Sequence, residues 1–378
     1  MTDLGRLGVY VHVPFCSSRC GYCDFNTYTA AELGSSDSRD TFADVLADEI
    51  GLAARTLGRR RVETVFVGGG TPTLIGSAGL LRVLAALRAD FDLADDAEIT
   101  TEANPDSVDD RMLAELREGG FTRISFGMQS SAPHVLAVLD RTHTPGASGW
   151  AARAARAAGF DHVNLDLIYG TPGETDVDLR RSVDDALSAG VDHVSAYALI
   201  VEEGTPLRRR VRAGDLPAPD DDVLADRYLL VDDLLTKAGM SWYEVSNWSL
   251  PGGECRHNLA YWHNEDWWGI GPGAHSHLDG VRWWNAKHPA TYADRLAAGG
   301  SPELEREVLS TEERRTERVM LGLRLSEGLP VDALPDPRRA LPEVEAGLLE
   351  HGPQDARRLV LTDQGRLLAD GIIRRLLA

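Results

Sequence analysis

The chain has 378 residues, of which 59 are acidic and 39 are basic, so its formal net charge is −20. This charge argues against nucleic acid as the main partner, because phosphate backbones bind basic surfaces. A hydrophobic content of 43%, with apolar runs well short of the roughly 20 residues of a membrane span, predicts a globular protein that does not cross a membrane. The first residues lack the basic and apolar regions of a secretory signal, so we expect a cytoplasmic protein.

From residue 8 to about 200, short β-rich runs alternate with longer segments of helical period. The predicted strands are 9–13, 64–68, 98–102, 123–127, 162–168 and 193–199. The predicted helices between them are 39–56, 78–88, 109–118, 146–158 and 175–189. Six β/α units in series imply a parallel sheet with right-handed crossovers. We therefore expect an α/β fold with a partial (β/α)6 barrel, and an open doubly wound sheet is the alternative.

Residues of unusual chemistry follow the carboxyl ends of these strands. A loop with three cysteines follows the first strand, and GGGTPT follows the second. Glu102 ends the third strand, Gln129 follows the fourth, and Asp166 lies on the fifth, which runs into YGTPGET. Ligands gather at this edge of parallel sheets and barrels, so the five segments predict one site.

The pattern changes beyond residue 200. A helix is predicted at 221–238, and residues 241–285 hold seven of the eight tryptophans and four of the eleven histidines. The closing sequence RLVLTDQGRLLADGIIRRLLA predicts a strand, a turn and a helix, typical of a winged-helix-like α+β appendix with a packing or lid role. We expect three parts: a core at 1–205, a Trp/His-rich extension at 206–300 and a small C-terminal domain at 301–378.

Three of the four cysteines, Cys16, Cys20 and Cys23, form C-x3-C-x2-C on one loop. Clustered thiols in a cytoplasmic protein indicate metal ligation or redox chemistry rather than disulfides. Thiolates are preferred ligands of iron–sulfur clusters and of zinc. We interpret the loop as the ligand set of a [4Fe–4S] cluster with one iron free of protein ligands. The alternatives are zinc completed by Cys255 or His257, a disulfide, and an inert group of buried thiols.

This spacing at the end of a first strand, with Tyr22 just before the last cysteine, resembles the radical S-adenosylmethionine (SAM) family. The resemblance implies a radical-SAM barrel in which the open iron binds the amino and carboxylate groups of SAM. YVHVPFC, GGGTPT, TEANPD, SFGMQS, NLDLIYGTPGET and HNLAYW sharpen it to the branch of oxygen-independent coproporphyrinogen III oxidases, over nearly the whole chain. The SAM contacts that it implies are Tyr10, Tyr22, Gly69, Gly70, Thr71, Glu102, Gln129, Arg141 and Asp166.

Simpler interpretations exist for some of these residues taken singly. Gln129 and Asp166 could cap strand ends, and Arg141 could form a surface ion pair. Their placement beside the cysteine loop favours the site interpretation.

Two departures separate the chain from the oxidases of this branch. The oxidases resemble C-x3-C-x2-C-x-C, whereas Phe25 stands at the fourth cysteine position, and few residues precede the first strand here. The chain resembles instead the haem chaperones of the branch. That resemblance implies that the protein binds haem, together with a [4Fe–4S] cluster and SAM, and transfers the haem to acceptor haemoproteins. The alternative is a radical SAM enzyme that decarboxylates coproporphyrinogen III oxidatively to protoporphyrinogen IX, or that acts on a small molecule.

The late segment CRHNLAYWHNEDWWGIGPGAHSH supports haem binding on chemical grounds. A neutral imidazole is a favoured axial ligand of haem iron, and aromatic side chains can wall a flat macrocycle. In the chaperones the histidine of H-N-x-x-Y-W is the proposed haem ligand, which implies His257 here. The alternative is a core histidine in an ordinary tryptophan-rich core. Cys255 is either an auxiliary thiolate or a small buried residue, and we expect the latter. We expect GIGPGAHS to form a tight turn that lines the haem cavity. A homodimer and peripheral membrane contact stay open.

Overall fold

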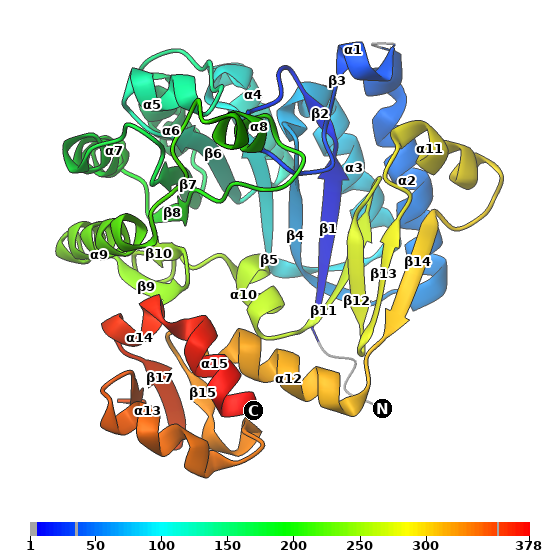
Figure 1. Cartoon of the computed structure of the whole chain (residues 1–378). Helices are drawn as coiled ribbons and strands as arrows, with labels where there is room; N and C mark the ends of the chain where they lie inside the picture. The colour runs from blue at the N-terminus through cyan, green and yellow to red at the C-terminus, as the bar shows by residue number, and fades with distance from the viewer. Residues whose placement is uncertain (1–5, 35–36, 354) are drawn as a thin grey trace.

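The structure, a computed structural model, describes residues 6–34, 37–353 and 355–378. Residues 1–5, on which part of the expectation about a secretory signal rests, lie outside the described residues. The main sheet has twelve strands in the order β14-β13-β12-β11-β1-β4-β5-β6-β7-β8-β10-β9 (Figure 1).

Six parallel strands form the centre of this sheet and confirm the six predicted strands. They are β1 (Leu7–Val13), β4 (Arg61–Gly69), β5 (Asp92–Ala103), β6 (Arg123–Gln129), β7 (His162–Tyr169) and β8 (His193–Ala198). Each pairs in parallel with the next one along the chain. The strand order never reverses among the six, so the switch point of a doubly wound sheet is absent from this described part of the chain. The partial (β/α)6 barrel is therefore confirmed.

The predicted helices are confirmed on the outside of these strands. They are α2 (Asp37–Leu57), α3 (Gly76–Asp90), α4 (Asp110–Gly119), α6 (Ala147–Ala157), α7 (Asp176–Ser188) and α9 (Asp221–Lys237). Local sequence explains their starts: a capping box of Thr175 and Asp178 opens α7, and the Asp109 side chain accepts a backbone N–H of α4. The short helices α1 (Ala30–Leu33), α5 (Pro133–Val138) and α8 (Pro206–Ala213) were not predicted.

One helical stretch, Pro72–Asp90, is long and apolar enough to cross a membrane by length and composition alone. It comprises the 3-10 turn η1 (Pro72–Ile75) and α3. Leu80, Leu84 and Leu87 of α3 lie in the main hydrophobic core against the sheet. One face of the stretch thus packs against the barrel, and its other face is exposed.

The Trp/His-rich segment extends the same sheet, which the sequence did not predict. Its elements are β9 (Ser241–Glu244), β10 (Asn247–Ser249), α10 (Arg256–Trp262), β11 (Asp266–Ile270), β12 (His275–Leu278), β13 (Val281–Asn285), α11 (Pro289–Ala297) and β14 (Glu303–Val308). Strand β11 pairs in parallel with β1, and β12 to β14 continue antiparallel. Trp268 and Trp283 meet edge to face, with ring centroids 4.9 Å apart, inside the main core. The division of the chain at 205/206 and 300/301 stays a prediction.

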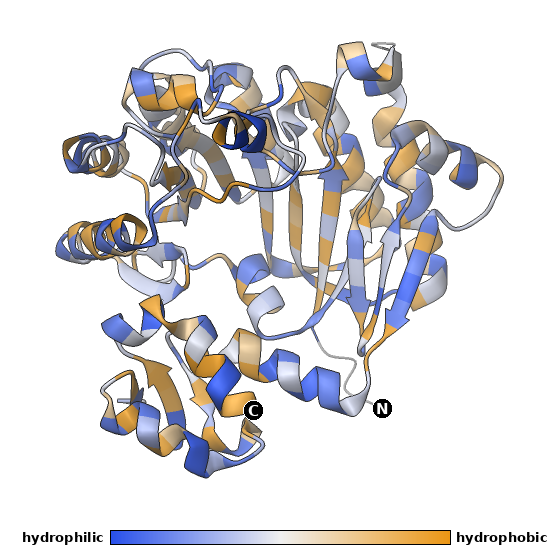
Figure 2. Ribbon diagram, in the orientation of Figure 1, coloured by the Kyte–Doolittle hydropathy of each residue, from blue (hydrophilic) through white to orange (hydrophobic). Residues whose placement is uncertain are grey.

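The C-terminal module has its own hydrophobic core, separate from that of the barrel. Its elements are α12 (Thr311–Gly322), β15 (Leu329–Pro330), η3 (Val331–Ala333), η4 (Pro337–Ala340), α13 (Leu341–Glu345), β16 (Leu349–His351), β17 (Arg358–Leu361), α14 (Asp363–Leu367) and α15 (Ala369–Leu377). The strands form an antiparallel sheet in the order β15-β17-β16. The predicted strand, turn and helix at the end of the chain are confirmed. Figure 2 shows apolar strands in this module and a largely polar α12 that links it to the barrel.

Candidate functional site

The cysteine loop leaves β1 and carries a two-residue parallel pair, β2 (Phe15–Cys16) with β3 (Tyr28–Thr29). The three thiols, on Cys16, Cys20 and Cys23, are half-buried. Backbone hydrogen bonds fix the middle of the loop: Gly21 donates to the Leu139 carbonyl at 3.0 Å and accepts from the Leu207 N–H at 2.8 Å. The end of α5 and the start of α8 therefore hold the loop in place.

One cavity of about 320 Å³ lies against this loop, at the carboxyl ends of the barrel strands. The structure brings eleven of the thirteen predicted site residues to its lining: Cys16, Tyr22, Cys20, Cys23, Gly69, Gly70, Thr71, Glu102, Gln129, Arg141 and Asp166. The volume is in the range of about 300 to 1,000 Å³ that is typical of small-molecule sites. Residues from five separate strand ends thus form a single site.

The glycines of GGGTPT allow the backbone of β4 to approach the cysteine loop. The Gly70 N–H donates to the Val13 carbonyl at 2.8 Å, and the Thr71 N–H donates to the Phe15 carbonyl at 2.7 Å. A Cβ atom on Gly70 would lie 2.4 Å from the Phe15 oxygen and 2.9 Å from the sulfur of Cys16. Only glycine fits this approach without displacing the loop.

Arg141 lies inside the cavity rather than on the surface, so its interpretation as a surface ion pair is wrong. One guanidinium nitrogen donates to the sulfur of Cys20 at 3.3 Å, and another donates to the Gly127 carbonyl at 2.9 Å. Its buried Nε has no hydrogen-bond partner in the described part of the chain. The cation is therefore placed to stabilise negative charge on the cysteine loop and on a ligand in the cavity.

Gln129 has a left-handed backbone, with φ of 67°, where the register between β6 and β7 is irregular. A non-glycine residue in this region is strained, and such strain persists where the surrounding structure imposes it, frequently at functional sites. The irregularity turns the end of β6 into the cavity. This geometry favours a ligand contact over simple strand-end capping.

Two carboxyl groups, on Glu102 and Asp166, line the same cavity. Burial, together with the charge of Asp166, raises the pKa of Glu102 to about 8, although the Gly69 N–H donates to this carboxyl at 3.0 Å. Burial also raises the pKa of Asp166, against hydrogen bonds from Asn164 at 2.7 Å and Ser125 at 3.1 Å. The pair can accept hydrogen bonds from sugar hydroxyls, as the resemblance implies for Glu102.

Tyr10 does not line the cavity. Its hydroxyl lies 2.9 Å from Nδ1 of His12, and Nε2 of His12 lies 2.8 Å from the Asn26 carbonyl. Burial lowers the pKa of His12, so the neutral ring accepts from Tyr10 and donates to Asn26. Tyr10 thus supports the far end of the cysteine loop, and its contact with SAM stays a prediction.

His257 also lies away from the cavity, on α10, with 1% of its surface exposed. Its Nδ1 is hydrogen-bonded to the Thr64 hydroxyl at 2.8 Å, and its Nε2 to the Tyr261 hydroxyl at 2.9 Å. The ring stacks on Phe66, with centroids 5.4 Å apart. Burial lowers the pKa of His257 to about 4, so the imidazole is neutral. In this conformation both ring nitrogens already have partners, as in a core histidine.

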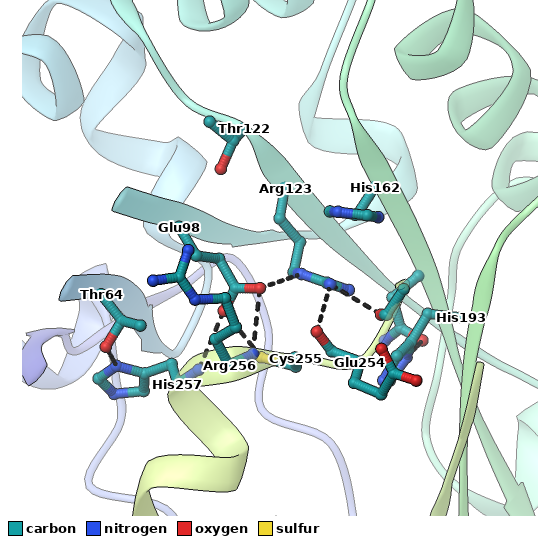
Figure 3. A network of polar contacts seen from close by, with 12 residues as sticks. Thr64, Glu98, Thr122, Arg123, His162, His193, Glu254, Cys255, Arg256 and His257 are labelled. Atoms are coloured by element: carbon teal, nitrogen blue, oxygen red, sulfur yellow. Dashed lines mark hydrogen bonds and ion pairs between the residues drawn. The ribbon is translucent and has the colours of Figure 1, made fainter. Parts of the chain in front are cut away.

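A buried carboxylate that the sequence analysis missed holds the start of α10 (Figure 3). Glu98 forms an ion pair with Arg123 at 3.0 Å and accepts the backbone N–H groups of Arg256 and His257. Cys255, which is 6% exposed, donates its thiol to the same carboxylate at 3.4 Å. Cys255 is therefore a small buried residue, as expected.

The turn of GIGPGAHS packs against the cysteine loop and is not in the lining of the cavity beside that loop. Its expected place in a haem cavity stays a prediction. The Asn26 side chain donates to the carbonyls of Pro272 at 3.0 Å and Lys287 at 2.8 Å. Gly271 has a φ of 105°, and a Cβ atom there would lie 2.4 Å from the His12 carbonyl oxygen. The glycines are thus needed for close backbone packing.

Several residues of the lining were not among the predicted site residues, although three of them belong to the motifs TEANPD and SFGMQS. They are Asn104, Asp106, Ser107, Ser125, Thr142 and His143. Asp106 accepts the Thr144 N–H at 2.8 Å and so ties the segment after Arg141 to the end of β5. TEANPD had been noted as a motif, and its last three residues were the available clue.

The donor set fits a cluster bound by three thiolates. The three sulfurs border one cavity, and burial followed by the neighbouring Cys23 raises the pKa of Cys16 to about 11. A raised pKa means that ionising the buried thiol is unfavourable. Bound cationic iron would offset this penalty, because ligation deprotonates thiols. In the described ranges no three His, Cys, Asp or Glu side chains converge as they would around a single metal ion.

Comparisons with known proteins show the family of the chain. The family model of the radical SAM superfamily matches residues 10–186, and that of the HemN C-terminal domain matches residues 309–368. The heme chaperone HemW of Mycobacterium tuberculosis (strain H37Rv) is 57% identical over 373 residues, which cover 98% of this chain and 94% of that protein. The heme chaperone HemW of Escherichia coli K12 is 35% identical over 335 residues, or 87% of this chain and 85% of that protein.

A solved structure supports the fold. Coproporphyrinogen III oxidase (HemN) of Escherichia coli superposes with a TM-score of 0.84, at 24% sequence identity, over 98% of this chain and 90% of that chain. Membership of the radical SAM superfamily implies a [4Fe–4S] cluster and SAM as cofactors. With its full-length similarity to the two chaperones, the chain belongs to the HemW family of radical SAM proteins.

Proposed function

We propose that the protein is a cytoplasmic haem chaperone, which binds haem and transfers it to acceptor haemoproteins. The observation that carries this proposal is the 57% identity to a heme chaperone over 98% of the chain. In this proposal Cys16, Cys20 and Cys23 hold the [4Fe–4S] cluster, which supplies one-electron chemistry when bound. The rest of the cavity lining holds SAM, with Arg141 beside Cys20 and with Glu102 and Asp166 in the same lining.

His257 is the proposed axial ligand of the haem iron. Its neutral imidazole has the right protonation state, but iron can reach Nε2 only after the Tyr261 hydroxyl is displaced. Losing one such hydrogen bond costs about 1 kcal/mol, which a metal–ligand bond can offset. The ring is buried, so α10 must also move outward for haem to enter.

An anaerobic haem titration of the cluster-reconstituted protein tests the proposal. We expect saturation near one haem per chain, with a Soret band that is altered in His257→Ala. His275→Ala is the matched control, because His275 on β12 is exposed and stacks on Trp284 of β13. Failure of the parent protein to bind haem would refute the chaperone proposal. An unchanged Soret band in His257→Ala would refute only the ligand assignment.

A radical SAM enzyme is the second candidate, because the cavity beside the cysteine loop is complete. Its substrate would be coproporphyrinogen III or a small molecule. Under reducing conditions with SAM, an enzyme of this kind releases 5′-deoxyadenosine in proportion to substrate turned over. Formation of 5′-deoxyadenosine that depends on an added substrate would favour this candidate over the chaperone.

A further inference from the structure

A second and larger cavity, of about 860 Å³, lies between the barrel and the C-terminal module. The barrel contributes the ends of β7 and β8, the start of α9 and the turn between β9 and β10. The C-terminal module contributes α14 and the start of α15, which lie next to α9 and β9 in Figure 1. None of the thirteen predicted site residues is in this lining.

The lining leaves large apolar side chains in contact with solvent. Ile200 is 64% exposed and Leu368 is 53% exposed, although they come from opposite sides of the cavity. Tyr197, Val245 and Leu367 are also exposed and line the same space. Exposed apolar residues that gather around a concave surface indicate a binding site, whereas isolated ones are ordinary.

The floor of the cavity is aromatic. The guanidinium of Arg366 lies 5.5 Å from the ring centroid of Tyr228 and 4.7 Å from that of Trp242. The indole Nε1 of Trp242 is buried and has no hydrogen-bond acceptor among the described residues. Flat rings with one unsatisfied donor suit a flat ligand with polar groups at its edge.

Two arginines provide the charge for such polar groups. Arg366 is held by Asp232 at 2.8 Å and by Asp363. Arg324 pairs with Asp370, whose side chain is 80% exposed. An ion pair with an exposed partner contributes little stability, so an incoming carboxylate can replace Asp370 on Arg324 at small cost.

We propose that this interdomain cavity binds haem through its apolar faces, with a haem carboxylate on Arg324. The inference rests on the proposed chaperone function and names a second place for the same cargo. It requires no movement of α10, because the cavity is open to solvent, whereas His257 is enclosed. The cavity would thus hold haem before or after ligation at His257.

Shared lining residues connect this cavity to the barrel interior. Tyr197 borders both the interdomain cavity and an interior cavity of about 100 Å³, which Asn258 of the HNLAYW motif also lines. Glu102 and Asp166 border both the interior cavity and the cavity at the cysteine loop. The ring of Tyr197 therefore separates the proposed haem site from the interior that leads to the cluster.

Binding of iron-free protoporphyrin IX, followed by absorbance and fluorescence, tests the inference without iron ligation. We expect Ile200→Asp and Leu368→Asp each to weaken the affinity about tenfold or more. Val177→Asp and Leu341→Asp are matched controls, because these side chains are 75% and 58% exposed and lie outside the cavity. Circular dichroism and thermal unfolding establish that all four variants fold.

Three further variants sharpen the test. Asp370→Asn removes the carboxylate that competes for Arg324 and should strengthen porphyrin binding, whereas Arg324→Met should weaken it. His257→Ala should bind protoporphyrin IX like the parent protein. Porphyrin and haem binding that is unchanged in Ile200→Asp and Leu368→Asp would overturn the cavity inference and leave the chaperone proposal standing. A parent protein that binds neither ligand would overturn both.

Discussion

Glu98 on β5 accepts the backbone N–H of His257 on α10 at 3.0 Å. The same carboxylate faces Arg123 on β6, and both side chains are almost fully buried. Burial alone would raise the pKa of Glu98, but Arg123 and the N–H groups of α10 outweigh it and hold the pKa below its ordinary value. The helix that carries the HNLAYW motif is therefore anchored by charge to two strands of the barrel.

Replacement of this carboxylate should be strongly destabilising. In Glu98→Ala the Arg123 cation stays buried without its partner, and the start of α10 loses its acceptor. Breaking a buried ion pair on one side costs about 3 to 5 kcal/mol. Urea unfolding measures the change in the free energy of unfolding. Glu115→Ala is the control, because its ion pair with Arg111 is on the surface, and a similar loss in both variants would contradict the prediction.

Serine at Cys16, Cys20 or Cys23 should abolish cluster binding and leave haem binding largely intact. A hydroxyl does not replace a thiolate as a ligand of iron in such a cluster. Iron and sulfide analysis and the visible spectrum of anaerobic protein measure the cluster content. Haem titration measures haem binding. Cys255→Ser is the control and should keep the cluster, because Cys255 lies at Glu98 outside the cavity. Simultaneous loss of cluster and haem in the three variants would contradict two separate sites.

The barrel and most of its site could be predicted because both depend on local sequence patterns. Each parallel strand is a short apolar run between capped helices, and most of the predicted site residues lie at the end of such a run or just after it. Arg141 shows the limit: the sequence could not show that it bends back to the sulfur of Cys20, because this contact joins residues 121 positions apart. The resemblance to a family gave Arg141 only as a predicted SAM contact.

The Trp/His-rich segment was harder to interpret for a physical reason. Its strands are three to six residues long and alternate weakly, and β11 pairs with β1 across more than 250 residues. Glu98 carried no motif, yet it organises α10 from β5. Pairings and ion pairs of this kind arise from tertiary packing, which overrides local propensity.

Gly70→Ala should impair cluster assembly. The added methyl group would meet the Phe15 carbonyl and the sulfur of Cys16, so the cysteine loop must shift. We expect a lower iron content after reconstitution, with the barrel still folded by circular dichroism. Gly300→Ala is the matched control, since its nearest atom is a carbonyl oxygen at 3.4 Å and its φ is not in the left-handed region. Equal iron content in both variants would show that the loop tolerates the shift.

Glu49 of α2 provides a test of stability against pH. It is 1% exposed and accepts hydrogen bonds from the Gly271 N–H and the Asn285 side chain at 2.7 Å, and from the Tyr292 hydroxyl. Burial is the largest effect on it and raises its pKa to about 7, so the folded state holds a proton that the unfolded chain releases near pH 4.5.

Between these pH values the folded state binds more protons than the unfolded chain. The contribution of Glu49 to the free energy of unfolding therefore falls as the pH rises from about 4.5 to about 7. The shift corresponds to roughly 3 kcal/mol as an order of magnitude. Glu49→Gln cannot ionise, so the parent protein should lose stability relative to this variant between pH 5 and pH 8. Urea unfolding at both pH values measures the difference, with the surface change Glu312→Gln as the baseline. Parallel stability curves for the parent and Glu49→Gln would mean that the Glu49 carboxylate is already charged at pH 5, held by its three donors.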